Sequence, residues 1–206
     1  MPPSKESRGT SWANPSNKNE QQINSRIILT SCDTTTHLSA GALIKNSNYF
    51  PTFRGIYFAG HSAGAHLVAK LLSGADFLER TPGSRRLQAA FLISGVYDLR
   101  EIVHTYVNDA VRLPEEWAVA MSPLFDDYKH LFERKIRMYI LAGEHDSGTF
   151  KRQSREFYEH LLDVCRTQHM YFEIKDRLDH FDIVENFANQ DNFLKNLVVH
   201  DVRKHL

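Results

Sequence analysis

FAGHSAGAH, residues 58–66, is the stretch on which the interpretation of the whole chain rests, because it contains the pattern Gly60-x-Ser62-x-Gly64. Upstream, residues 55–59 (GIYFA) are apolar and rich in β-formers, which predicts a strand covered on both faces of a parallel sheet. Downstream, residues 65–72 (AHLVAKLL) favour a helix. A serine in a sharp turn between a strand and a helix is typical of a nucleophile elbow, in which close packing excludes side chains at both glycine positions.

The composition indicates a single neutral domain. The 206 residues suffice for one substantial core, and Lys plus Arg balance Asp plus Glu, 25 against 25, so no net field favours nucleic acid or an anionic membrane. No apolar run reaches the roughly 18 residues of a membrane span, and the N-terminus lacks the apolar stretch of a signal peptide. The two cysteines, Cys32 and Cys165, are too few for a disulfide scaffold. We therefore expect a cytoplasmic protein with reduced thiols and a small substrate, without nucleic-acid or membrane partners.

The distribution of apolar residues predicts a polar tail followed by an α/β domain. Residues 1–26 are mostly polar residues and proline, so they predict a disordered tail before a domain that comprises residues 27–206. In addition to 55–59, strands are expected at 27–30, 87–93, 136–142 and 170–174. Helices are expected at 37–45, at 150–166 and over most of 182–206, with short helices between the strands at 87–93 and 136–142. Strands that alternate with helices imply a mostly parallel sheet flanked by helices.

Candidate partners for the serine follow it in the chain. A serine hydroxyl is a weak nucleophile at neutral pH, so it needs a histidine as base and a carboxylate to orient that histidine. Where a nucleophile elbow is present, both partners come after later strands, whose carboxyl ends meet at the same edge of the sheet. Asp146 follows the strand expected at 136–142, and His180 lies in the loop after residues 170–174. Ser62, Asp146 and His180 are therefore the candidate catalytic residues.

Other residues are candidates for the same roles. Glu144 is the rival acid, and Asp179 and Asp182 are weaker rivals because they lie beside the candidate histidine in the sequence. His61 and His66 flank the serine, but a residue next to the nucleophile generally points away from its hydroxyl. No H-x-x-x-H or H-E-x-x-H pair occurs near these residues, so no metal site is expected.

Several motifs in a fixed order carry a specific family likeness. They are GHSAGAHL (60–67), SGVYDL (94–99), SP (122–123), EHD (144–146) and DHFDIVE (179–185). Over residues 53–195 the chain resembles kynurenine formamidase, also called arylformamidase, a family of α/β-hydrolases.

The resemblance implies hydrolysis of an aromatic formamide, N-formyl-L-kynurenine, to L-kynurenine and formate, a step of tryptophan breakdown that needs no cofactor. Position by position, Ser62 would attack the formyl carbon, His180 would take and return the proton, and Asp146 would orient His180.

The chain departs from the family pattern before the elbow. There the family carries an H-G-G motif that supplies N–H groups to the oxyanion hole, whereas this chain has neither a His-Gly nor a Gly-Gly dipeptide. The N–H of Ala63 is the donor that remains. Loss of one donor costs about 3 kcal/mol of transition-state stabilisation, or roughly 10² to 10³ in rate.

The strands before the elbow also depart from the pattern. Since only residues 27–30 are available there, we expect a partial α/β-hydrolase fold with N-terminal strands missing. The exposed sheet edge could pair with another chain in a homodimer. The sequence leaves three functions open: a truncated or alternatively spliced formamidase with weak activity, a broader carboxylesterase or amidase, and an inactive isoform that acts as an interaction or regulatory form.

Overall fold

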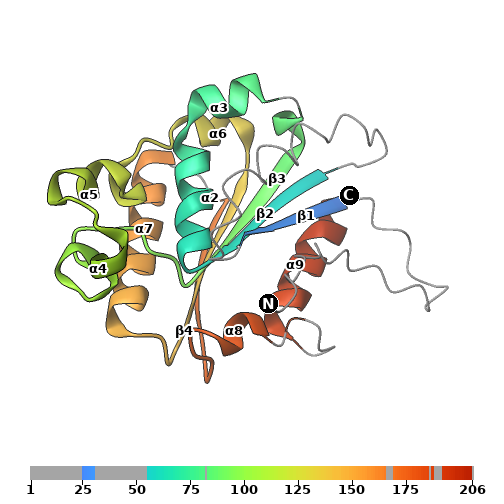
Figure 1. The fold of residues 1–206 in the computed structure, drawn as a ribbon. Coiled ribbons are helices and arrows are strands. Elements are labelled where there is room, and N and C mark those ends of the chain that lie inside the picture. Colours follow the sequence, from blue (N-terminus) through green and yellow to red (C-terminus); the bar gives the residue numbers. More distant parts are fainter. Residues whose placement is uncertain are drawn as a thin grey trace, which may run out of the picture.

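A computed structural model of the chain describes residues 25–30, 55–81, 83–165, 169–185, 187 and 192–205. Its strands form one five-stranded sheet in which every neighbouring pair is parallel (Figure 1). The order in the sheet equals the order in the chain: β1 (Ser25–Thr30), β2 (Gly55–His61), β3 (Leu87–Ile93), β4 (Arg137–Gly143) and β5 (Met170–Lys175). This confirms the expected parallel α/β architecture.

Helices lie in the described crossovers from β2 to β5, because each parallel strand must start again at the same end as its neighbour, and helices cover both faces of the sheet (Figure 1). On one face lie α2 (Ala63–Ser73), α3 (Ala75–Arg80) and α7 (Gly148–Cys165). The segment between β3 and β4 contains α4 (Val107–Val111), α5 (Glu115–Met121) and α6 (His130–Arg134). Single 3₁₀ turns occur at Ser84–Arg86, Ile102–His104 and Pro123–Phe125. The opposite face carries α8 (Asp182–Glu185) and α9 (Phe193–Lys204).

The strands supply two separate hydrophobic cores. On β2, Ile56 and Phe58 pack on the side of α2 and α7, whereas Tyr57 and Ala59 pack on the side of α8 and α9. Successive side chains of a strand point to opposite faces, so a strand between two helical layers must be apolar at every position. This requirement explains the continuous apolar runs in the sequence.

Most of the expected elements are present, with shifted ends. The strand at 87–93 has the expected bounds, the strand expected at 55–59 continues to His61, and the helix expected at 150–166 is α7. The helical C-terminal region expected over most of 182–206 is present as α8 and α9. The helix expected at 37–45 and residues 1–24 of the tail lie outside the described residues.

The start of β1 differs from the expected tail boundary. Ser25 and Arg26 belong to the strand and pair with Gly55 and Ile56 of β2, although their polar side chains suggested a tail. Main-chain pairing does not depend on side-chain polarity, so the composition could not reveal this boundary. Pairing with β1 on one side and β3 on the other places β2 inside the sheet, next to β1 at its edge.

A buried ion pair joins α9 to β4. Arg137 donates two hydrogen bonds of 2.8 Å to the carboxylate of Asp201, and the Tyr139 hydroxyl donates to the same carboxylate. The side chains of Arg137 and Asp201 are 8% and 1% exposed. A charge buried at this depth depends on its partner, because removal of one member leaves the other without compensation.

No helix in the described part of the chain is both long and apolar enough to cross a bilayer.

We predict that Asp201→Ala lowers the free energy of unfolding by about 3–5 kcal/mol, because it leaves the Arg137 guanidinium buried and unpaired. Lys204→Ala on the exposed surface of the same helix is the control, and its effect is expected within about 0.5 kcal/mol. Urea denaturation measures the free energy of unfolding of both variants. Equal stabilities of the two variants would show that the ion pair does not hold α9.

Candidate active site

Ser62 occupies a strained turn between β2 and α2. Its backbone has φ 56° and ψ −122°, a combination that non-glycine residues seldom adopt, and its N–H donates to the carbonyl of Ile93 at 2.9 Å. The strand and the helix approach closely here: a Cβ at Gly60 would lie 2.4 Å from the carbonyl oxygen of Gly64. The strand, strained serine and helix expected from the sequence are therefore all present.

Ala63 is the first residue of α2. Amides in the first turn of a helix have no acceptor within the helix, so the Ala63 N–H lies among donors that are available at the helix N-terminus. This is the position from which an oxyanion donor next to the serine would act.

Asp146 is a buried acid with three hydrogen-bond donors around it. Its Oδ1 accepts the Nδ1–H of His180 at 2.8 Å. Its Oδ2 accepts the hydroxyl of Ser94 at 2.6 Å and the N–H of Gly143 at 2.8 Å. Both carboxylate oxygens are thus satisfied, which fixes the plane of the carboxylate and the position of the ring that it holds.

These contacts keep Asp146 ionised. Burial alone would raise the pKa of the carboxyl, but the hydrogen bonds from His180, Ser94 and the Gly143 amide lower it below its ordinary value. The charged form therefore prevails at neutral pH. A carboxylate at Nδ1 of a histidine fixes the tautomer in which Nε2 is free to accept a proton.

His180 lies in the loop after β5, with 18% of its side chain exposed. The rings of His61, Phe150 and Phe181 surround its imidazole, with centroid distances of 4.6, 4.4 and 5.3 Å. Within the described residues, no hydrogen bond joins the Ser62 hydroxyl to His180. Such contacts are often long in structures without substrate and shorten in the reacting complex.

The rival acids have other partners. Glu144 accepts the N–H of Arg177 at 2.8 Å and is exposed. Asp179 accepts the N–H groups of Phe181 and Asp182, both at 2.8 Å, and so shapes the turn after His180. Of the acids considered, Asp146 is the one that hydrogen-bonds to the His180 ring.

Two contacts around these residues were missed in the sequence. Ser94 follows β3 with φ 46° and holds Asp146; the available signal was a serine directly at the end of a buried strand. His61 is expected to point away from the Ser62 hydroxyl, which stays a prediction, but the sequence did not show that its Nε2 lies 2.7 Å from the carbonyl oxygen of His180. The alternation of residues in a strand predicts the face of the sheet to which a side chain points, but it does not predict which loop packs against that side chain.

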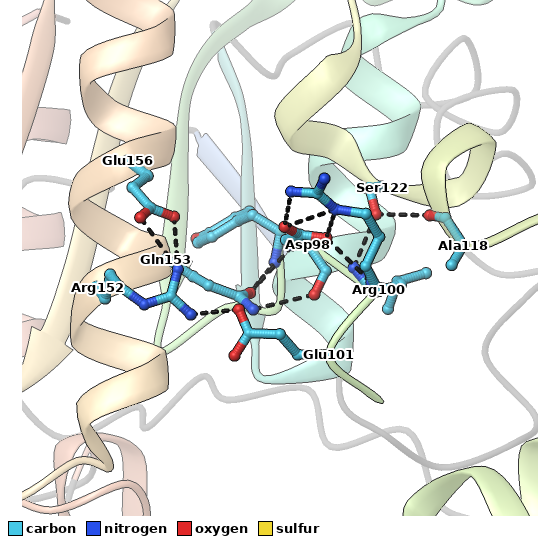
Figure 2. A network of polar contacts seen from close by, with 10 residues as sticks. Asp98, Arg100, Glu101, Ala118, Ser122, Arg152, Gln153 and Glu156 are labelled. Carbon is cyan, nitrogen blue, oxygen red and sulfur yellow. Dashed lines mark hydrogen bonds and ion pairs between the residues drawn. The ribbon is translucent and has the colours of Figure 1, made fainter. Parts of the chain in front are cut away.

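The loop after Ser94 is tied to helices on both sides (Figure 2). The Gln153 side chain of α7 accepts the N–H groups of Tyr97 and Asp98 at 2.9 and 3.0 Å, and donates to the Asp98 carbonyl at 3.0 Å. The Ser122 hydroxyl accepts the N–H of Leu99 at 2.7 Å. Beyond the end of β3 the main chain no longer pairs with a neighbouring strand, and these side-chain hydrogen bonds hold its N–H and C=O groups instead. The backbone after Ser94 is therefore fixed in position.

An open hollow of about 480 Å³ lies over this network. None of the expected catalytic residues lines it; the lining residues are Asp98, Arg100, Glu101, His104, Leu124, Arg152 and Glu156. Its charged groups are paired with one another, as Figure 2 shows for Arg100 with Asp98 and for Arg152 with Glu101 and Glu156. The hollow therefore presents three carboxylates and two guanidinium groups, all in ion pairs, with one negative charge in excess.

We predict that Gly60→Ala destabilises the protein by about 1–3 kcal/mol, because the added methyl group meets rigid main chain at the elbow. Gly148→Ala is the matched control, since a Cβ there meets nothing within 4 Å, and we expect a change below about 0.5 kcal/mol. Thermal and urea unfolding compare the two variants. A Gly60→Ala variant as stable as the control would contradict the close approach of β2 and α2.

Curated relatives of the chain are kynurenine formamidases. The chain is 34% identical to that of Danio rerio over 151 residues, which are 73% of this chain and 50% of the relative. Those of Salmo salar and Drosophila melanogaster are 35% and 36% identical over 70% and 69% of this chain, and 49% of each relative. The chain thus spans about half the length of the curated relatives it matches. No family model matches it.

Solved structures share the fold at low sequence identity. A putative thioesterase from Silicibacter sp. TM1040 matches with a TM-score of 0.59 and 23% identity over 77% of this chain and 55% of that chain. A truncated carbohydrate esterase from gut microbiota matches with a TM-score of 0.56 and 16% identity, over 79% and 67% of the two chains. The acylaminoacyl peptidase of Pyrococcus horikoshii has the same TM-score and identity, over 80% of this chain and 26% of that chain. The chain therefore has an α/β-hydrolase fold and is a homologue of kynurenine formamidases over about 70% of its length.

Proposed function

We propose that the chain is a formamidase-type serine hydrolase that converts N-formyl-L-kynurenine to L-kynurenine and formate, a step of cytoplasmic tryptophan breakdown. The observation that supports this most is the 2.8 Å hydrogen bond between Asp146 and His180, at the edge of the sheet where the strained Ser62 also lies. The homology to kynurenine formamidases supports the substrate class.

In the proposed first half-reaction, Nε2 of His180 removes the proton of the Ser62 hydroxyl as Oγ attacks the formyl carbon. The imidazolium that forms is stabilised by the ionised Asp146, which already accepts its Nδ1–H. Collapse of the tetrahedral intermediate breaks the formyl C–N bond, and His180 returns the proton to the leaving aromatic amine. The products of this half are L-kynurenine and a formyl ester of Ser62.

In the second half-reaction, water takes the place of the amine. His180 removes a proton from the water as its oxygen attacks the formyl ester, and then returns the proton to Oγ of Ser62 as formic acid leaves and ionises to formate. Each step moves one proton through the same ring nitrogen, so the position of the His180 ring matters twice in each cycle.

The negative oxygen of both tetrahedral intermediates needs N–H donors. In this proposal the Ala63 amide at the start of α2 supplies one of them, and the positive end of the helix dipole acts in the same direction. The sequence has no H-G-G motif to supply companions. Slow turnover is the expected consequence, by roughly 10² to 10³ for each donor lost.

Two other functions differ in what they require of the site. A broader carboxylesterase or amidase would use the same three residues, because the triad does not discriminate between acyl groups. An inactive form that acts by interaction would not need a reactive Ser62, and the missing oxyanion motif is the feature that favours it.

We predict that a fluorophosphonate probe labels the wild-type chain and fails to label Ser62→Ala, because the probe reacts with a serine activated by its base. Ser147→Ala is the control: this serine is exposed close to Asp146 in the chain, and its loss should leave labelling unchanged. Intact-protein mass spectrometry measures the adduct. The rate of N-formylkynurenine hydrolysis, compared with that of a simple aryl ester, then distinguishes a formamidase from a broader esterase. Absence of labelling in the wild-type chain would favour the inactive form.

We predict that Asp146→Asn reduces the labelling rate by a factor on the order of 10⁴, because the amide cannot hold His180 in the reactive tautomer. Glu144→Gln, which removes the charge of the exposed rival acid, should change the rate less than about threefold. Second-order rate constants for the probe compare the two variants. The reverse ranking would assign the acid to Glu144.

A further inference from the structure

His61 makes a contact with His180 that the two aromatic neighbours do not make. All three rings lie against the His180 imidazole, but His61 also places Nε2 at 2.7 Å from the main-chain carbonyl of His180. Since a carbonyl oxygen can only accept, Nε2 of His61 must carry a proton and donate it. The bond therefore fixes both the tautomer of His61 and the distance between the two residues.

The bonds on the other side of the loop connect it to the acid and to itself. The N–H of His145 donates to the carbonyl of Leu178 at 2.9 Å, and Asp179 caps the turn that follows His180. These contacts fix the loop relative to the β4–α7 connection, which carries Asp146. They leave its separation from the serine undetermined.

His61 supplies the link to the serine. It is the last residue of β2, directly before Ser62 in the chain. Among the described residues, its ring makes the hydrogen bond that joins the elbow strand to the loop of His180. One side chain thus links the backbone that carries the nucleophile directly to the backbone that carries the base, in addition to the longer route through Ser94 and Asp146.

His61 is suited to this place because it stays neutral. Burial lowers the pKa of His61, and positive charge on His180 acts in the same direction; the His180 carbonyl and the charge of Asp146 oppose this to a smaller extent. A neutral His61 donates to the carbonyl without adding a second positive charge beside the ring that becomes protonated.

We propose that His61 is a positioning residue, whose Nε2–H holds the His180 carbonyl and so sets the distance between the His180 imidazole and the Ser62 hydroxyl. This inference rests on the proposed function, because it assigns a role within the same site.

Two substitutions separate the hydrogen bond from the ring contact. His61→Gln keeps an N–H donor at a similar distance from Cα but loses the ring, whereas His61→Phe keeps a ring beside His180 but loses the donor. We expect His61→Phe to slow fluorophosphonate labelling by about 10- to 100-fold, since a displacement of about 1 Å can cost that much. His61→Gln should stay within about threefold of wild type, as expected when the donor itself is restored. Equal rates for His61→Phe and wild type would overturn the inference.

A second measurement does not depend on reactivity. Nuclear Overhauser effects between the ring protons of His180 and the side-chain protons of Ser62 report how close the two residues lie, and we expect them at equal strength in wild type and in His61→Gln but weaker in His61→Phe. Thermal unfolding of both variants identifies a general loss of structure, which would affect the two alike. If wild type is not labelled, the proposed function fails while the NMR comparison still decides the role of His61; an unchanged Overhauser effect between His180 and Ser62 in His61→Phe would refute that role.

Discussion

Parallel pairing of the strands is the constraint on which the candidate site depends. Because all five strands point the same way, the carboxyl ends of β2, β3, β4 and β5 lie at one edge of the sheet. A polar residue follows each of them in turn: Ser62, Ser94, Asp146 and His180. The strands thus bring residues up to 118 positions apart to the same end of the sheet, and the contacts of the loops then set how these residues lie relative to one another.

Hydrogen bonds at this edge form a closed circuit. The Ser62 amide donates to the end of β3, where Ser94 donates through its hydroxyl to Asp146; Asp146 holds the His180 ring, and the His180 carbonyl accepts from His61, next to Ser62. A closed circuit restrains each member from two sides. It also explains how two strained serines, with φ of 56° and 46°, persist at a cost of about 1–3 kcal/mol each.

Helices on both faces of the sheet hold the segments that carry this hydrogen-bonded circuit. Helix α2 and the Gln153 bonds of α7 hold it from one face of the sheet, and α8 follows directly after His180 on the other. Ile183 of α8 is fully buried in the core that α9 shares, and the Arg137–Asp201 pair fixes α9 to β4. The loop of His180 is therefore followed by a segment that the second core anchors.

Local sequence determined the strands, the elbow and the three candidate residues, because these depend on short-range features: apolar runs for strands with two covered faces, small residues where a strand and a helix approach closely, and chain order for the acid and the base. Sequence also favoured Asp146 over Glu144, and the structure places Asp146 against the His180 ring. What only the tertiary structure decided are the contacts that cross between strands. The hydroxyl of Ser94 on Asp146 and the ring of His61 under the His180 carbonyl join residues 52 and 119 positions apart, and such partners are set by how the strand ends and loops pack together in space.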